Sequence, residues 1–104
     1  MKRPQLVERI AKTLRHIAPE AETIVYGSES RGEARADSDI DLLILLDAPR
    51  LSPEREMEIT SSLYELEVDT GVIISPLILT REQWEKRPFH TPFSINVINE
   101  GTAL

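Results

Sequence analysis

Apolar side chains recur at helical spacing near the start of the chain. The stripe consists of Leu6, Ile10, Leu14 and Ile17. Pro4 suits the first turn of a helix, and Pro19 closes the segment because proline cannot continue a helix. The pattern predicts a first helix over residues 4–17.

Three later segments carry the signals of a helix start. Ser52-Pro53 is an N-cap followed by proline at the first helical position, and the apolar stripe after it predicts a helix near residues 53–68. Residues 80–83, Thr-Arg-Glu-Gln, form a capping-box pattern that predicts a short helix. Thr91-Pro92 repeats the cap-plus-proline signal, and Gly101 suits the end of that last helix.

Strand-like patterns fill the stretches between these helices. Residues 23–26 are β-branched and aromatic, and a Gly-Ser pair follows them directly, as expected of a strand that runs into a tight turn. Residues 40–46 are apolar apart from one aspartate, which is typical of a central strand covered on both faces. Residues 72–74 and 77–79 also favour strand, and Pro76 between them predicts an edge position or a bulge.

Composition and charge limit the classes of function. The 104 residues predict one domain spanning residues 1–104. With 18 acidic and 12 basic residues the formal charge is -6, so the chain repels phosphate backbones and no extended nucleic-acid groove is expected. Cysteine is absent and no long hydrophobic stretch follows the basic start. We therefore expect no disulfide, signal peptide or membrane span, and a cytoplasmic location.

The first candidate for chemistry is the Gly27-Ser28 turn. Glycine lets the backbone turn sharply and approach a phosphate, and N–H groups that enter a following helix point toward anionic oxygens. Ser28 adds a hydroxyl group. The same pair also suits an ordinary turn, so the phosphate site needs further support.

The second candidate is the pair Asp39 and Asp41. Residues two apart on a strand project from the same face, so the two carboxylates repel each other unless a cation lies between them. A hard cation such as magnesium fits this pair. The alternative is a solvated pair at the strand entry, neutralised by Arg31 or Arg35.

Together these motifs resemble a known signature. The matching positions are Gly27, Ser28, Arg31, Gly32, Ser38, Asp39, Asp41 and Leu42. They resemble the nucleotidyltransferase superfamily related to DNA polymerase β, and most of all its minimal nucleotidyltransferase family. The resemblance implies an α+β fold, a polymerase β-like core with a small mixed sheet flanked by helices.

The resemblance also implies roles for these residues. Gly27-Ser28 would hold the triphosphate of ATP, and Asp39 and Asp41 would hold Mg²⁺ while an acceptor hydroxyl attacks the α-phosphorus and pyrophosphate leaves. Arg31 would contact phosphate or brace the turn. We favour bracing, in which Arg31 holds Asp37 or Asp39 in register.

Active members of the family carry a third carboxylate on a later strand, which completes the metal site. The chain departs from the family pattern here, because Glu67-Val68-Asp69-Thr70-Gly71 precedes the apolar strand residues. Asp69 is the candidate for the third catalytic and metal-binding carboxylate, and Glu67 is the fallback. The alternative is that Asp69 only begins a turn before Gly71.

The acceptor surface has to come from elsewhere, because the chain has no second domain to supply it. The resemblance implies a small helical HEPN-type partner, which the chain would neutralise as an antitoxin by transferring AMP to it. A homo-oligomer is the other expected assembly. Two alternatives stay open: a nucleotide-binding antitoxin that acts by binding alone, and a homodimeric enzyme that modifies a small molecule such as an antibiotic.

Overall fold

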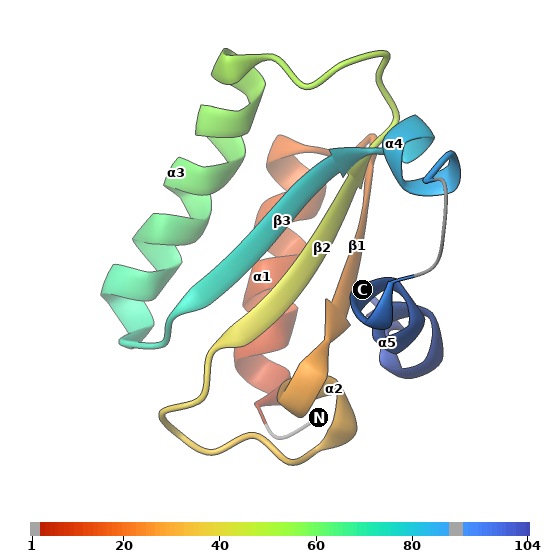
Figure 1. The fold of residues 1–104 in the computed structure, drawn as a ribbon. Helices are drawn as coiled ribbons and strands as arrows, with labels where there is room; N and C mark the ends of the chain where they lie inside the picture. Colours follow the sequence, from red (N-terminus) through yellow and green to blue (C-terminus); the bar gives the residue numbers. More distant parts are fainter. Residues whose placement is uncertain (1–2, 88–90) are drawn as a thin grey trace.

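The computed structural model of the chain describes residues 3–87 and 91–104 (Figure 1). His90, which stands between Pro88-Phe89 and Thr91-Pro92 in the sequence and for which the sequence predicts a surface or packing role, lies outside the described residues. The helices are α1 (Pro4–Ile17), α2 (Gly27–Arg31), α3 (Pro53–Thr70), α4 (Arg81–Glu85) and α5 (Pro92–Glu100). The strands are β1 (Ala21–Tyr26), β2 (Ile40–Leu46), β3 (Ile74–Thr80) and β4 (Thr102–Ala103).

The strands form one mixed sheet in the order β3-β2-β1-β4. β2 runs parallel to β3, whereas β1 is antiparallel to both β2 and β4. The expected α+β fold with a small mixed sheet is confirmed. β2 lies in the middle of the sheet, and every residue in it except Asp41 is buried.

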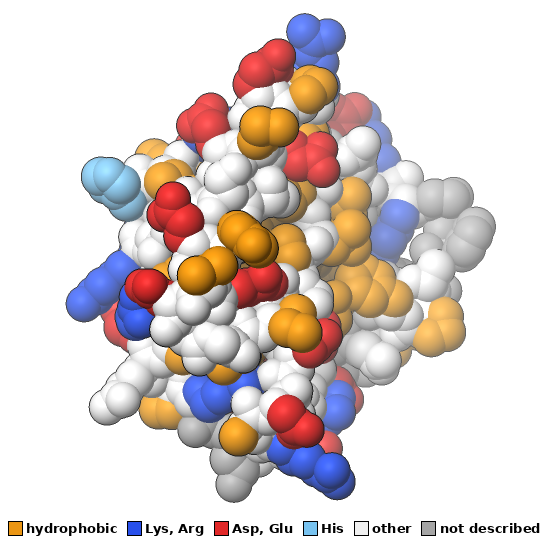
Figure 2. Space-filling view, turned by 90° about the vertical axis from the view of Figure 1, so that its left-hand side faces the viewer, with side chains coloured by type: hydrophobic (Ala, Val, Ile, Leu, Met, Phe, Trp, Pro, Cys, Tyr) orange, Lys and Arg blue, Asp and Glu red, His pale blue; other side chains and the backbone are white. Residues whose placement is uncertain are grey.

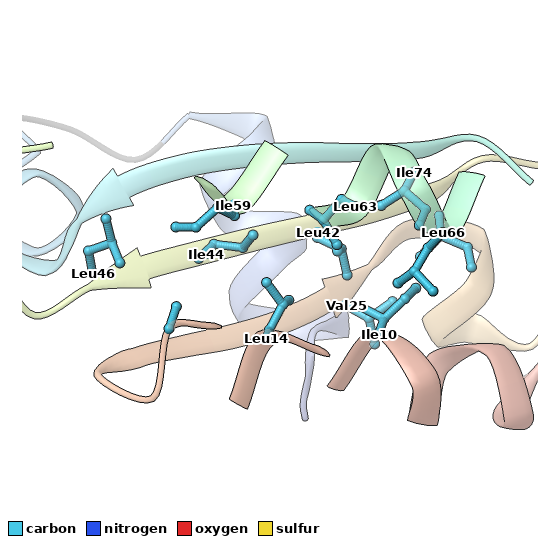
Figure 3. Close-up of a cluster of buried hydrophobic side chains, with 12 residues drawn as sticks. Ile10, Leu14, Val25, Leu42, Ile44, Leu46, Ile59, Leu63, Leu66 and Ile74 are labelled. Atoms are coloured by element: carbon cyan, nitrogen blue, oxygen red, sulfur yellow. The ribbon is translucent and has the colours of Figure 1, made fainter. Parts of the chain in front are cut away.

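Helices cover both faces of the sheet. Side chains of α1 and α3 pack on one face against the inward residues of β1 and β2, as Figure 3 shows for Leu14, Leu63 and Leu42. On the other face, Leu43 and Leu45 pack with Val97 of α5 and with aromatic side chains of β1, α4 and α5. None of the helices within the described residues combines the length and apolar character needed to cross a membrane.

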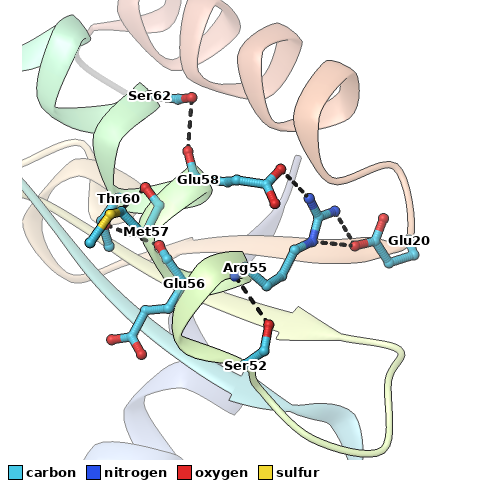
Figure 4. Close-up of polar contacts among 8 residues, drawn as sticks. All are labelled: Glu20, Ser52, Arg55, Glu56, Met57, Glu58, Thr60 and Ser62. Carbon is cyan, nitrogen blue, oxygen red and sulfur yellow. Dashed lines mark hydrogen bonds and ion pairs between the residues drawn. The ribbon is translucent and has the colours of Figure 1, made fainter.

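The helix boundaries follow their capping residues. Ser52 Oγ accepts a hydrogen bond from the Arg55 N–H at the start of α3 (Figure 4), and Gly71 closes the helix with a positive φ of 73°. The helix therefore continues two residues beyond the expected end at residue 68. The capping box at Thr80 is also present.

β3 is one continuous strand at the edge of the sheet. The Ile73 carbonyl accepts a hydrogen bond from the Ile40 N–H, so the alternate residues Ile74 and Pro76 direct their backbone groups toward the free edge. Proline lacks an N–H and is tolerated there. The edge position expected for Pro76 is confirmed, but the expected interruption of the strand is wrong, and the strand begins only at Ile74.

Candidate active site at the end of the central strands

The glycine turn and one of the two aspartates meet at the same end of the sheet. β1 ends at Tyr26, which lies opposite Asp41 in the antiparallel ladder, and α2 begins at the next residue. Gly27 has a φ of 73°, a conformation that side chains rarely adopt. A β-carbon at Gly27 would lie 2.8 Å from Asp41 Oδ2, so a larger residue there would displace the carboxylate from this position. The expected proximity of Asp41 to the turn is present.

Asp39 lies beside Asp41 and is exposed just before β2 begins. Burial raises the pKa of Asp41 above its ordinary value, and the neighbouring charge of Asp39 raises it further, whereas Arg31 lowers it. Two close carboxylates, one of them partly desolvated, form an environment that favours a bound cation or proton. Asp41 is thus not simply solvated, although the charge of Arg31 acts on it as the alternative expected.

A residue that the sequence analysis missed stands next to this pair. The parallel register places Ser75 of β3 directly beside Asp41, and Ser75 Oγ lies 3.4 Å from Asp39 Oδ2. Ser75 therefore occupies the position on the later strand where a third carboxylate could face the other two. The signal in the sequence was the register of two apolar strands, which becomes visible only once their pairing is known.

The structure does not group Asp69, the expected third carboxylate, with Asp39 and Asp41. Because α3 continues to Thr70, Asp69 lies in its last turn, where it forms an ion pair with Arg9 of α1 at 3.2 Å. The Asp69 side chain is 68% exposed, and that of Arg9 is 52% exposed. Among the residues that the structure describes, no three His, Asp or Glu side chains are arranged to hold a metal ion.

The fallback, Glu67, has a different role. Its Oε1 accepts a hydrogen bond of 2.7 Å from the backbone N–H of Ile74, so it caps the first edge-facing donor of β3. The helix extends further than expected, because residues 69–70 were read as the approach to a strand and in fact belong to α3.

Arg31 braces the turn, but through other acids than expected. Its guanidinium donates to Glu100 Oε2 at 2.8 Å and to Glu33 Oε2 at 3.1 Å, rather than to Asp37 or Asp39. Ser30 Oγ adds a contact of 2.8 Å to Thr102 Oγ1. Side chains of α2 are thus tied to the last residue of α5 and to Thr102, which follows that helix.

A buried ion pair fixes the other side of the turn. Glu29 in α2 is fully buried and accepts hydrogen bonds from the Arg3 backbone N–H at 2.8 Å and from Arg3 Nε at 2.6 Å. A buried carboxylate needs such partners because its desolvation is costly. Neither residue carries a motif signal in the sequence. The pair links the start of α1 to the turn and restrains the position of Gly27.

The donor set fits a magnesium ion that is shared with a nucleotide. Mg²⁺ commonly takes only one or two protein carboxylates and fills its remaining positions with water and substrate phosphate oxygens. Asp39 and Asp41 supply two such carboxylates next to the Gly27-Ser28 turn. The Ser28 carbonyl accepts a hydrogen bond of 2.9 Å from the Glu33 N–H, which fixes the main chain of the turn.

Comparison with known proteins gives matches in sequence and in fold. A family model described as "Nucleotidyltransferase domain" matches residues 7–103. The chain is 34% identical over 82 residues to a Methanocaldococcus jannaschii protein named "Putative protein adenylyltransferase MJ0141". This match covers 78% of the chain and 75% of that protein.

Solved structures share the fold. One, described as "Structure of putative minimal nucleotidyltransferase", is 27% identical with a TM-score of 0.63, and the match covers 100% of this chain and 97% of that one. Another, described as "Crystal structure of the toxin-antitoxin with AMP-PNP", has a TM-score of 0.64 at 22% identity and covers 92% of this chain and 69% of that one. The second likeness is one of fold alone.

Proposed function

Because the chain belongs to the nucleotidyltransferase domain family, we propose that it transfers AMP from ATP to a hydroxyl group on a partner protein. The name of the Methanocaldococcus jannaschii relative supports protein adenylylation as the activity. A neighbour of the same fold is described as a toxin-antitoxin with AMP-PNP, which supports a protein partner and a nucleotide. A helical HEPN-type partner, with this chain as antitoxin, remains a prediction from the sequence.

The observation that carries the proposal is the position of the Asp41 carboxylate beside Gly27. A β-carbon on residue 27 would come within 2.8 Å of the carboxylate, so the phosphate-binding turn and the metal-binding acid are built around each other. An ordinary turn has no need of this approach. In the proposed site, Asp41 and Asp39 face the space that the β- and γ-phosphates would enter.

Each residue in the site has a defined task. The backbone N–H groups at the start of α2 and the Ser28 hydroxyl bind phosphate oxygens. Asp39 and Asp41 would hold Mg²⁺, which would supply positive charge against the negative charge that develops as pyrophosphate leaves. Arg31 keeps α2 attached to Glu100, so that the turn does not move when the anion binds.

Ser75 favours a second candidate function. A third carboxylate at this position would strengthen the metal site and accept the proton of the attacking hydroxyl, and a serine hydroxyl is a far weaker base. The second candidate is therefore a nucleotide-binding module that silences its partner by binding alone. The two candidate functions share the nucleotide site and differ only in whether AMP is transferred from the bound ATP to the partner.

The experiment is transfer of AMP from α-labelled ATP to the protein that co-purifies with the chain from its source cell. We expect magnesium-dependent labelling by the wild type, none by the Asp39→Ala, Asp41→Ala double variant, and wild-type labelling by the control Asp69→Ala. Calorimetric titration with ATP and magnesium accompanies each assay, and thermal melting checks the fold of each variant.

Two outcomes would change the conclusion. Equal affinity for magnesium-ATP in the wild type and the double variant would exclude Asp39 and Asp41 as ligands. A wild type that binds magnesium-ATP and silences the co-purified protein without labelling it would exclude the transferase and leave the binding module.

A further inference from the structure

An unpartnered apolar stripe runs along the outer side of α3. Met57, Tyr64 and Val68 are spaced seven and four residues apart, so they share one face of the helix. They are 68%, 64% and 68% exposed, and Ile73, just beyond the helix, is 59% exposed. Large apolar side chains that gather on one helix face mark a surface for a partner. Figure 2 looks onto this side of the molecule and shows hydrophobic side chains with acidic ones beside them.

A groove accompanies the stripe between α3 and the edge strand β3. It encloses about 640 Å³, and its walls include Met57, Thr60 and Tyr64 from the helix and Ile74 and Pro76 from the strand. The stripe therefore borders a concave surface, which a rod-shaped element of a partner can enter.

Three of the four positions of β3 whose backbone faces the free edge offer no free N–H group to another strand. The Ile74 N–H already donates to Glu67 at 2.7 Å, Pro76 has no N–H, and the Thr80 N–H donates to Gln83 Oε1 at 3.0 Å. A sheet edge that lacks free donors at alternate positions resists strand addition. The groove is thus suited to a helix that packs through side chains.

Charge selects the kind of helix. α3 carries six carboxylates and one guanidinium, and that guanidinium, on Arg55, is held by Glu20 and Glu58 (Figure 4). By helical spacing, Glu54 and Glu65 flank the stripe on one side, and Glu56 and Glu67 flank it on the other. A second copy would place acids against acids, whereas a partner with lysines and arginines beside its apolar face would pair with them.

We propose that the stripe and groove of α3 bind an amphipathic, basic-flanked helix of the partner protein. The inference rests on the proposed function only in supposing that such a partner exists, and the surface lies on the opposite face of the sheet from Asp41. Docking therefore needs neither nucleotide nor magnesium. A second copy of this chain and an extended strand are the competing occupants.

The experiment places the photo-crosslinking residue p-benzoylphenylalanine at position 64 in the source cell and, as a control, at Ile95 of α5, which is 44% exposed. Mass spectrometry identifies the crosslinked segment. We expect one segment of another protein, captured from position 64 only, with apolar residues at helical spacing and lysine or arginine beside them. Capture of this chain's own peptides, of an acidic or non-helical segment, or of nothing above the Ile95 control overturns the proposal.

A peptide with the captured sequence then serves as the probe in fluorescence anisotropy. Tyr64→Ala is expected to weaken its binding about 30-fold, as for a central aromatic anchor, and Ile95→Ala to leave it unchanged. Glu54→Lys with Glu65→Lys should weaken binding and flatten its salt dependence. Unchanged binding in Tyr64→Ala, with its melting temperature preserved, refutes the surface.

The Asp39→Ala, Asp41→Ala variant separates this inference from the proposed function. It lacks the nucleotide site but keeps α3, so crosslinking from position 64 should be as strong in this variant as in the protein with both aspartates intact. Crosslinking without any AMP transfer in the wild type would leave the docking surface and remove the transferase. AMP transfer by the wild type together with unchanged peptide binding in Tyr64→Ala would support the transferase and refute the docking surface.

Discussion

Replacing Gly27 with alanine tests the core of the proposed site, because two separate penalties meet at this residue. The backbone has a φ of 73°, and the new β-carbon would lie 2.8 Å from Asp41 Oδ2. Gly71 provides a matched control. It has the same φ of 73°, but a β-carbon there would have nothing within 4 Å.

The two penalties have different sizes and different consequences. A non-glycine residue in the left-handed region costs about 1–2 kcal/mol, so both variants should lose that much stability. For a domain of this size the loss corresponds to a fall in melting temperature of roughly 5–15 °C. The clash at Gly27 adds little to it, because the carboxylate is the far end of a side chain that can rotate away.

Rotation of Asp41 removes it from the metal-binding position, so the functional effect should be confined to Gly27→Ala. Displacing a metal ligand from its oriented position commonly lowers affinity by about 10- to 100-fold. We expect a loss of this size for magnesium-ATP in Gly27→Ala and unchanged affinity in Gly71→Ala.

Urea unfolding measures the stability of both variants, and calorimetric titration with magnesium-ATP measures binding to the folded protein. Equal binding in the two variants would refute the argument that Gly27 is required by Asp41. A Gly71→Ala variant as stable as the wild type would show instead that the backbone penalty has been overestimated.

Three further changes have distinct expected outcomes. Asp69→Ala should leave AMP transfer unchanged and should change the free energy of unfolding by no more than about 0.5 kcal/mol, because the ion pair of Asp69 with Arg9 is exposed. Loss of transfer would restore Asp69 as the third carboxylate. Glu20→Gln should lower stability at neutral pH by no more than about 1 kcal/mol. The hydrogen bond from Arg55 lowers the pKa of Glu20 below its ordinary 4.5, so this stabilisation is present above pH 4.5 and is lost as the pH falls through the lowered value. The melting temperatures of the wild type and of Glu20→Gln, measured from pH 7 to pH 2, should therefore converge at low pH. Ser75→Asp should raise magnesium affinity and lower the melting temperature in EDTA relative to the neutral control Ser75→Asn, and equal values for the two would show that the side chain does not face the metal site.

Much of the fold could be predicted because local signals and tertiary structure agree. The proline and the apolar stripe defined α1 from residue 4 to residue 17, and the unbroken apolar run defined β2. The end of α3 was placed too early, because the helix stops at the positive φ of Gly71 rather than at the last apolar residue. β4 consists of Thr102–Ala103 alone, which is too short to show the alternating pattern that predicts a strand.

In the candidate site, too, the residues that a local motif contains could be predicted, and the residue that tertiary pairing brings in could not. Gly27 and Asp41 lie within one motif of known spacing, so their meeting could be expected. Ser75 reaches the site through the pairing of β2 with β3, which are separated along the chain by α3. Asp69 and Glu67 are the last acids before β3, whereas the residue that the register places beside Asp41 is Ser75, inside the strand.

A site with two carboxylates and a serine has a physical consequence for how its ligands bind. In the proposed site, two protein oxygens would leave most of the magnesium coordination sphere to the phosphates and water, so metal and nucleotide should bind as one unit, each strengthening the other. In the proposed transferase, Asp39, Asp41, water or a group on the partner would receive the acceptor proton, because Ser75 is too weak a base. A partner that brings its own base would complete the active site as well as supply the acceptor hydroxyl. The difference between a transferase and a binding module would in that case be decided at the interface between the two proteins rather than within this chain.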